Sequence, residues 1–246
     1  MTTPTSAPNQ SPKQPYFDQI SDRYDRAVST WESVYRCARE IIAPWIRGAS
    51  VLDVGSGGIW VFDPAAAKEV TLLDISPKML ERIPLPLPHV RKVVGDARNL
   101  DGIAGASQDV ILYLLCVHHV VGRSRAEAFR MLDEVLVAAK AKCRPGGRIV
   151  IVEPTLTPWL YALESLLYPL TRAVLGLKKV PMIFFYSPRI LKSQIERCFG
   201  AEANVYPLEV KGWVDPLGGS FPGRIRIPAW VCPTRYFLFE CRLPSR

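Results

Sequence analysis

The sequence lacks the features of several common protein classes. No run of about 18 uncharged apolar residues occurs, so we expect no transmembrane helix. The six cysteines form no C-x-x-C pair, and no histidine spacing completes a zinc site, so we expect reduced thiols and no metal. The N-terminus also lacks the charged start and apolar core of a signal peptide. Together these absences predict a cytoplasmic protein.

Acidic residues are fewer than basic ones, which gives a formal net charge of +8. A positive excess is compatible with nucleic-acid or anionic-membrane binding, and equally with a basic surface that suits an anionic substrate. The Lys and Arg residues are scattered along the chain without a dense cluster. We therefore favour the second interpretation and expect no nucleic-acid partner.

The first fifteen residues differ in composition from the rest of the chain. Residues 1–15 are rich in Thr, Ser, Pro, Gln and Asn with almost no apolar content, which predicts a disordered tail. Residues 16–246 contain no linker-like stretch and are numerous enough for one large domain. We expect a single domain there, present as a monomer or a homodimer.

Short apolar runs alternate with helical patterns along this domain. Such alternation predicts an α/β fold, namely a doubly wound, Rossmann-like, seven-stranded and mostly parallel sheet. The strands are expected at residues 50–54, 69–73, 90–94, 109–115, 148–152, 203–210 and 236–241. Helices are expected at residues 29–46, after Ser76, from Ser124 and at residues 187–200, with Ser29 and Glu32 as a capping box in the first. Pro145-Gly146-Gly147 is expected to stop the chain before the fifth strand.

Residues 154–186 carry apolar and aromatic side chains at helical spacing. Because this segment follows the fifth strand, we expect a helical lid insertion at the carboxyl edge of the sheet, with Tyr168 and Tyr186 among the substrate-binding residues. A pair of core-packing helices is the alternative. The exposed face of such a lid could also touch a membrane surface. The Gly- and Pro-rich residues 211–234 are expected to form a long loop.

The segment Val51–Gly58 is a strand followed by a Gly-rich turn, which lets a nucleotide-like ligand approach the backbone closely. Asp53 has a clear use if that ligand carries a positive amino group. A dinucleotide fingerprint would need a small residue where this chain has Trp60. The turn therefore favours a cofactor without phosphates, and an ordinary strand-to-helix turn is the alternative.

Two further carboxylates follow predicted strands. Asp74 comes 19 residues after Gly55, a spacing that places an acid to hold ribose hydroxyls. Asp96 follows the third strand, where its carboxylate could accept from an adenine amino group. A helix cap and a solvated turn residue are the alternatives, although Ser76 is the better helix cap at the first position.

Several segments, taken in order, resemble the class I S-adenosylmethionine-dependent methyltransferases, and most of all the small-molecule enzymes of the ubiquinone and menaquinone pathways. These segments are Val51–Gly58, Leu73–Leu80, Val94–Leu100, Gln108–His119 and Arg144–Pro154, together with Tyr16-Phe17-Asp18 and Arg23-Tyr24-Asp25. The resemblance covers roughly residues 16 to 154. Five motifs in the right order are far more specific than any one of them.

The resemblance implies S-adenosylmethionine as cofactor, with S-adenosylhomocysteine as product. It assigns Asp53, Gly55 and Gly57 to the methionine end, and Asp74 to the ribose. The remaining cofactor-binding residues are Asp96 and Ala97 at the adenine, Cys116 beside the methionine, Tyr24 closing over the cofactor, and Ile75. This chain departs from the family in having Ile59 at the usual third glycine, which leaves the backbone contacts of the turn open.

The sequence gives a weaker signal for a catalytic general base than for the cofactor site. His118 and His119 follow the fourth strand, and either could act as general base for a hydroxyl acceptor because histidine titrates near neutral pH. Alternatively one packs structurally and the other lines the pocket. Glu153 ends the fifth strand and either binds substrate or caps a turn.

The function that these features predict is methyl transfer to an O, N or C atom of a small apolar or aromatic metabolite. The alternatives are a nucleic-acid or lipid methyltransferase, a nicotinamide oxidoreductase, and a non-catalytic binding protein with the same fold. The fourth strand ends in Leu-Leu-Cys-Val and not in an Asn-Pro-Pro-Tyr-like segment, which argues against a flipped base as substrate.

Overall fold

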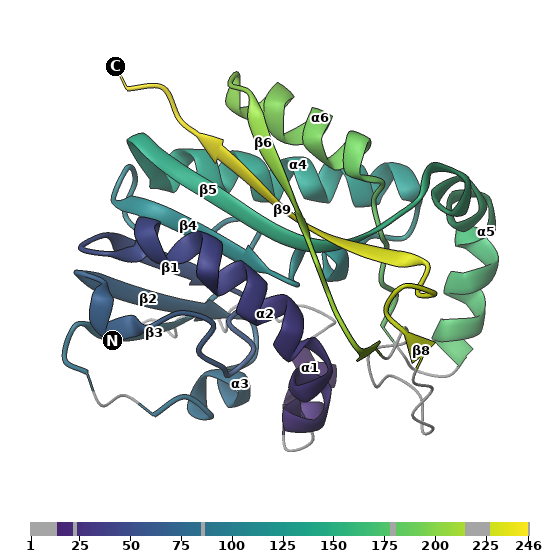
Figure 1. Ribbon diagram of the computed structural model, residues 1–246, viewed down its shortest axis with the longest axis horizontal. Helices are drawn as coiled ribbons and strands as arrows, with labels where there is room; N and C mark the ends of the chain where they lie inside the picture. The colour runs from purple at the N-terminus through teal and green to yellow at the C-terminus, as the bar shows by residue number, and fades with distance from the viewer. Residues whose placement is uncertain (1–13, 22–23, 85–86, 178–180, 215–226, 246) are drawn as a thin grey trace, which may run out of the picture.

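A seven-stranded sheet organises the chain in the computed structural model, which describes residues 14–21, 24–84, 87–177, 181–214 and 227–245 (Figure 1). Its strand order is β3-β2-β1-β4-β5-β9-β6. The strands are β1 (Ser50–Val54), β2 (Glu69–Asp74), β3 (Val90–Val94), β4 (Gln108–Leu114), β5 (Cys143–Leu156), β6 (Ala203–Leu208) and β9 (Thr234–Arg242). Only β9 runs antiparallel to its neighbours β5 and β6. The predicted doubly wound, mostly parallel sheet is confirmed.

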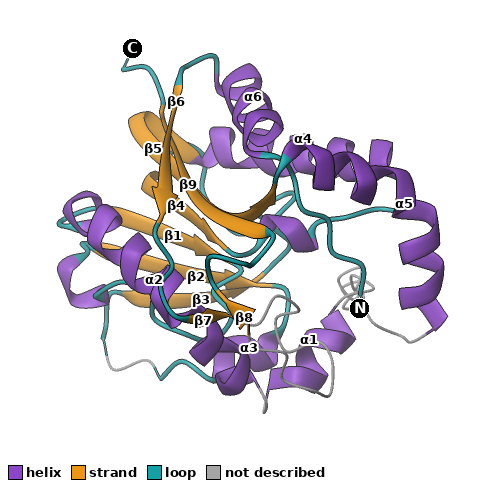
Figure 2. Cartoon of the chain, turned by 45° about the vertical axis from the view of Figure 1, so that its right-hand side comes forward, coloured by secondary structure: helices purple, strands orange, loops and turns teal. Residues whose placement is uncertain are grey.

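Helices cover both faces of the sheet, which is why its central strands are continuous apolar runs (Figure 2). All five residues of β1 are buried. Helix α2 (Tyr24–Ile46) packs on one face, and α4 (Arg125–Lys142) with α6 (Pro188–Phe199) packs on the other. The shorter elements are α1 (Gln14–Ile20), α3 (Pro77–Glu81), the 3-10 helices η2 (Pro64–Ala66) and η3 (Val117–His119), and the strand pair β7 (Trp213–Val214) and β8 (Ile227–Pro228).

Local signals place several helix ends correctly. The Ser76 hydroxyl accepts from Met79 N at 3.1 Å at the start of α3. The Ser124 hydroxyl does the same for Glu127 N at 3.1 Å at the start of α4. Each hydroxyl satisfies a backbone donor that the first turn of a helix cannot pair internally.

The N-terminal elements differ from expectation. Helix α2 begins at Tyr24, so Ser29 lies inside it and the predicted capping box is wrong. Helix α1 begins at Gln14, inside the predicted tail, while residues 1–13 lie outside the described part of the chain. The reason is tertiary packing, because Phe17 of α1 sets its ring edge-on to His119 at 5.2 Å between ring centroids.

Strand β5 is longer than expected and includes Pro145-Gly146-Gly147. The backbone after β9 supports this part of the strand, since Leu243 N donates to Gly147 O at 2.8 Å and Gly146 N donates to Pro244 O at 3.2 Å. The glycine pair therefore continues the strand because non-local pairing outweighs its turn propensity.

Between β5 and α6, the predicted helical insertion contains one helix, α5 (Pro158–Leu177), with Pro169 inside it. It stands beyond the carboxyl end of β5, at the far right in Figure 1. The loop expected at residues 211–234 contains the β7–β8 pair, and residues 215–226 lie outside the description. None of the described helices has the length and hydropathy needed to cross a membrane.

Candidate active site

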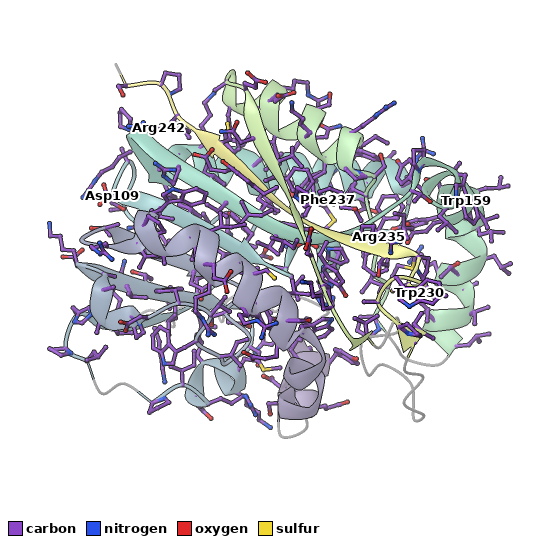
Figure 3. All side chains as sticks on the ribbon, in the orientation of Figure 1. Asp109, Trp159, Trp230, Arg235, Phe237 and Arg242 are labelled. Carbon is purple, nitrogen blue, oxygen red and sulfur yellow. The ribbon has the colours of Figure 1, made fainter. Side chains whose placement is uncertain are left out.

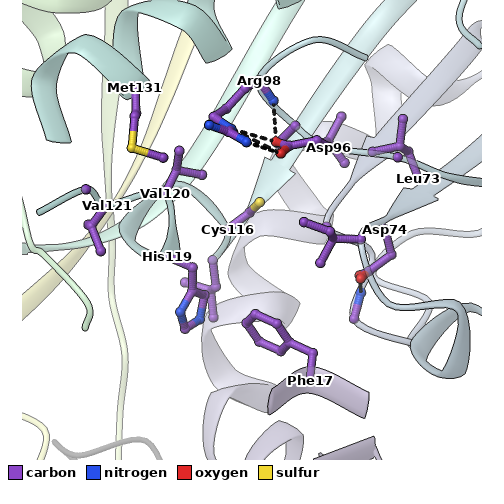
Figure 4. A pocket seen from close by; sticks show the side chains of 18 of the residues that line it. Phe17, Leu73, Asp74, Asp96, Arg98, Cys116, His119, Val120, Val121 and Met131 are labelled. Atoms are coloured by element: carbon purple, nitrogen blue, oxygen red, sulfur yellow. Dashed lines mark hydrogen bonds and ion pairs between the residues drawn. The ribbon is translucent and has the colours of Figure 1, made fainter. Parts of the chain in front are cut away.

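A cavity of about 580 Å³ opens at the carboxyl ends of β1, β2, β3 and β4 (Figure 4). Residues from these strand ends form one part of its lining, and residues from α1, α3, η3, α4, α5 and the connection between η3 and α4 form the rest. Strand order reverses beside β1, because the chain continues to β2 on one side and to β4 on the other. Open α/β sheets bind ligands at such a switch point.

The Gly-rich turn after β1 needs its glycines for two separate reasons. Gly55, Gly57 and Gly58 all have positive φ angles of 70°, 59° and 74°, which side-chain-bearing residues rarely adopt. A Cβ on Gly55 would also lie 2.5 Å from Cys116 Sγ. The turn therefore brings bare backbone to the cavity wall, where Gly55 and Gly57 are part of the lining.

Asp74 ties this turn to the end of β2. Its carboxylate accepts from Gly57 N at 3.0 Å and from Ser76 N at 2.9 Å. Burial raises the pKa of Asp74 to about 6, although these backbone donors counteract the effect. Asp74 and its neighbour Ile75 both line the cavity.

Asp53 is a buried acid without a partner. Neither of its carboxylate oxygens has a hydrogen-bond partner among the described residues. Burial, followed by the nearby charge of Asp74, raises the pKa of Asp53 to about 7. Asp53 lies next to Val54 of the lining rather than in the lining itself. An orphaned carboxylate at this turn fits a cofactor that brings a positive amino group.

Asp96 is engaged by a residue that the sequence analysis did not single out. Arg98 Nε lies 3.1 Å and 3.0 Å from the two Asp96 oxygens, and Arg98 Nη2 lies 2.6 Å from Oδ2 (Figure 4). Arg98 N adds a bond to Oδ1 at 2.9 Å. The ion pair raises the pKa of Arg98. Asp96, Ala97 and Arg98 all line the cavity, and the pairing of residues two apart was the signal that could have found Arg98.

The turn after β4 carries Cys116 and His119 into the lining, with Phe17 of α1 beside His119 (Figure 4). Burial raises the pKa of the Cys116 thiol well above its usual range, so the side chain stays neutral. His118 points elsewhere: it is buried, and its Nδ1 lies 2.6 Å from Glu153 Oε2. Of the two predicted candidates for the base, only His119 faces the cavity.

Three predicted substrate contacts need correction. Glu153 is buried against the turn after β4 and does not line the cavity. The Tyr168 hydroxyl donates to Gly122 O at 3.0 Å, and the Tyr186 hydroxyl donates to Ala128 O at 3.4 Å. Both rings pack on Phe184 in the core. Their hydroxyls are needed inside the fold, so neither tyrosine reaches the cavity. Tyr24 begins α2, and its side chain lies outside the described residues.

The far wall of the cavity was not predicted. It is built from Val120 and Val121, which follow the histidines, and from Met131 of α4. Arg123 and Arg172 reach the same cavity, the latter from α5. Such residues carry no local signature, because the fold of α4 and α5 brings them together. Among the described residues, no cluster of three or more His, Cys, Asp or Glu side chains could hold a metal ion.

Comparisons with known proteins agree with this geometry. Residues 52–151 match the methyltransferase domain family. Among solved structures, a chain of the complex between the Haloferax volcanii Trm112 methyltransferase activator and a methyltransferase is 16% identical, with a TM-score of 0.66 over 95% of this chain and 98% of that one. The Burkholderia thailandensis 1,6-didemethyltoxoflavin-N1-methyltransferase, bound to 1,6-didemethyltoxoflavin and S-adenosylhomocysteine, is 18% identical, with a TM-score of 0.62 over 100% and 94%.

A third solved structure, DhpI with S-adenosylhomocysteine, is 18% identical, with a TM-score of 0.59 over 95% of this chain and 96% of that one. At these identities the likeness is one of fold. No curated protein matches by sequence. Residues 52–151 therefore carry a methyltransferase domain, and the chain shares its fold with these solved structures, two of which hold S-adenosylhomocysteine.

Proposed function

We propose that this methyltransferase acts on a small apolar or aromatic molecule, at an oxygen, nitrogen or carbon atom. One observation carries the proposal: a single cavity joins the glycine turn and Asp74 to an apolar wall of Val120, Val121 and Met131. Its volume of about 580 Å³ falls in the usual range for small-molecule sites, roughly 300–1,000 Å³.

The residues present fit the cofactor. S-adenosylmethionine, when bound, supplies a methyl group on a positively charged sulfur. The unpartnered carboxylate of Asp53 would hold its amino group, and the bare turn at Gly55 and Gly57 would accept its methionine end. Asp74, beside Ile75, has lone pairs left for the ribose hydroxyls after accepting two backbone bonds. The adenine would lie at Asp96 and Ala97, sharing the Asp96 carboxylate with Arg98.

On the acceptor side, we assign the general base to His119. Its ring lies in the cavity between Phe17 and the ring of His118, so an acceptor hydroxyl could reach it there. A base of this kind is needed only when the acceptor atom carries a proton of high pKa. An acceptor that is already nucleophilic would need alignment alone.

The direct test is transfer of a labelled methyl group from S-adenosylmethionine to a panel of phenols, quinols and aromatic amines. We expect uptake by at least one class. For a phenol acceptor, we expect His119→Asn to lower kcat on the order of 100-fold. His89→Asn, which changes a histidine bonded to Pro64 O outside the cavity lining, is the matched control. Uptake into nucleic acid alone, or by no acceptor while the cofactor binds, would refute the proposal.

Helix α5 suggests where such an acceptor comes from. Of its side chains only Tyr168 is buried, and Trp159, Leu166 and Leu177 are 67%, 76% and 87% exposed. Trp159 is labelled on α5 in Figure 3. Its two charged residues turn toward the protein: Glu164 Oε1 accepts from Phe185 N at 3.3 Å, and Arg172 Nη1 donates to Arg123 O at 2.9 Å. The outer face of α5 is therefore apolar.

We propose that this face rests on an anionic membrane surface and collects a lipophilic acceptor. The net charge of +8 complements anionic lipid, and Arg172 connects α5 to the cavity lining. In a sedimentation assay with phosphatidylglycerol vesicles, the native protein should pellet with the vesicles and Leu166→Glu should stay in the supernatant. Val137→Glu alters a 59% exposed valine on α4 and should still bind. Absence of binding, or a dimer that Leu166→Glu dissociates, would overturn the membrane proposal.

A further inference from the structure

Glu153 is a buried carboxylate whose bonds all go to one short turn. It is 1% exposed, at the carboxyl end of the part of β5 that pairs with β4. Its Oε1 accepts from Cys116 N at 2.9 Å and from Val117 N at 2.5 Å, and its Oε2 lies 2.6 Å from His118 Nδ1. One side chain thus satisfies two backbone donors and one imidazole at the start of η3.

This turn needs external support. Leu115, just before it, has a φ of 54°, a left-handed conformation that is unfavourable for a leucine. The backbone N–H groups of Cys116 and Val117 point into a buried region, where donors without partners are strongly disfavoured. An apolar side chain in place of Glu153 would leave both donors and the His118 ring unsatisfied.

The same turn presents the cavity residues. Cys116 and His119 line the cavity from either end of η3, and the His118 ring lies 4.1 Å from the His119 ring between centroids. His118 is also held by its backbone, because Phe184 N donates to His118 O at 3.0 Å. The position of His119 therefore depends on His118, and that of His118 depends on Glu153.

We propose that Glu153 is a positioning residue for methyl transfer, acting through the turn at residues 115–119 without touching either substrate. The proposal rests on the proposed function only for its effect on rate. The carboxylate holds the proton of His118 on Nδ1 and orients that ring, and the ring in turn supports His119 at the cavity wall. Glu153 thereby sets the alignment that the reaction requires.

The test compares Glu153→Gln and Glu153→Ala with Glu240→Ala. Glu240 is a matched control, since it is also a buried glutamate of the sheet but bonds to Arg148 and Asn204, away from the turn. The glutamine oxygen can still accept from Cys116 N and Val117 N, while its amide group would donate to His118 Nδ1 and force the other tautomer. This variant also keeps the test open if Glu153→Ala does not fold.

Nitrogen NMR of the imidazole rings gives a readout that does not need activity, and the chain has only three histidines to resolve. We expect Glu153→Gln to exchange the protonated nitrogen of His118 while binding of S-adenosylhomocysteine stays within a few-fold of native. We expect Glu153→Ala to shift the His119 signals and to lower kcat on the order of 100-fold, more than it raises KM. Unchanged His118 and His119 signals in both variants, or equal losses in Glu153→Ala and Glu240→Ala, would overturn the proposal. Failure of the native protein to bind the cofactor would refute the proposed function, whereas the NMR result would remain valid as a test of the contact between Glu153 and His118.

Discussion

Two regions of the molecule are prepared for a ligand in opposite ways. One is the cavity floor at the ends of β1 and β2, and the other is helix α5. Polar groups are buried at the floor and directly beneath it: Asp74 accepts from Gly57 N and Ser76 N, and Asp53, next to the lining, has no hydrogen-bond partner among the described residues. On α5, apolar groups are exposed, with Leu166 and Leu177 mostly in solvent. Each arrangement is unfavourable for an isolated fold, and each becomes favourable when a molecule of matching chemistry covers it.

The two regions also differ in how much a residue change should matter. The floor depends on bare backbone, special φ angles and desolvated charge, so a single atom can break it. The α5 face is an apolar surface spread over one side of a helix, so truncating a single leucine to alanine should matter little, whereas placing a charge there should matter more.

The largest difference is expected between two glycine substitutions. Gly55→Ala places a methyl group against Cys116 Sγ at a φ of 70°, so we expect cofactor affinity to fall by more than about 100-fold and stability to fall by about 2 kcal/mol. Gly176→Ala adds a methyl group to open space on α5 and should stabilise the protein by about 0.5–1 kcal/mol. Calorimetric titration measures the cofactor affinity and urea unfolding measures the stability of each variant. Equal effects at the two sites would contradict the difference between the two regions.

Next in size is a pair of leucine truncations. Leu72→Ala in the centre of β2 removes a fully buried side chain and should cost about 2–5 kcal/mol of unfolding free energy. Leu166→Ala on α5 should change it by less than about 0.5 kcal/mol. A cost above about 2 kcal/mol at Leu166 in dilute protein would mean that another copy of the chain already covers the α5 face.

A smaller effect is the dependence on pH. The two regions should share the pH dependence of stability and differ in the pH dependence of ligand binding. The pKa values of Asp53, directly beneath the floor, and of Glu164 on α5 are both raised to about 7 by burial. The folded state then holds protons that the unfolded state has released, so the free energy of unfolding should fall as pH rises from about 4 to about 7. Asp53→Asn and Glu164→Gln should each flatten this slope.

Only Asp53 should affect the cofactor. Ionisation of Asp53 creates the negative charge that an amino group seeks, so affinity for S-adenosylhomocysteine should increase between about pH 6 and pH 8. That increase should vanish in Asp53→Asn and persist in Glu164→Gln. Titrations at three pH values decide the point, and an increase that survives Asp53→Asn would assign the effect to another group, with Asp74 the first candidate because its pKa is raised to about 6.

Local patterns were enough to predict the sheet and the place of Asp74 at its edge. The run of apolar residues at β1, the Ser76 cap and the acid at the end of β2 are each set by neighbours in sequence, and all three hold in the structure. What could not be predicted depends on contacts between distant segments. The Phe17–His119 contact joins residues about a hundred positions apart, and Glu153 meets its donors in another strand-end turn.

The aromatic residues between β5 and α6 show the limit most clearly, with Tyr168 on α5 and Tyr186 in the connection that follows it. Helical spacing and composition are the same for a residue that faces a cavity and one that faces the core, so Tyr168 and Tyr186 were assigned to substrate. Their hydroxyls instead bond to backbone carbonyls of Gly122 and Ala128. Which face of a helix is buried is settled by the elements that pack on it, and no periodicity in the helix alone reports that.

The central claim is that the floor of the cavity binds S-adenosylmethionine through Asp74 and the glycine turn. Calorimetric titration of S-adenosylhomocysteine into the native protein and into Asp74→Ala tests it most directly, with NAD as the comparison ligand. We predict micromolar affinity for the native protein, about −8 kcal/mol, with binding lost in Asp74→Ala and none for NAD. Equal affinity in the two proteins, or binding of NAD in place of S-adenosylhomocysteine, would contradict the account.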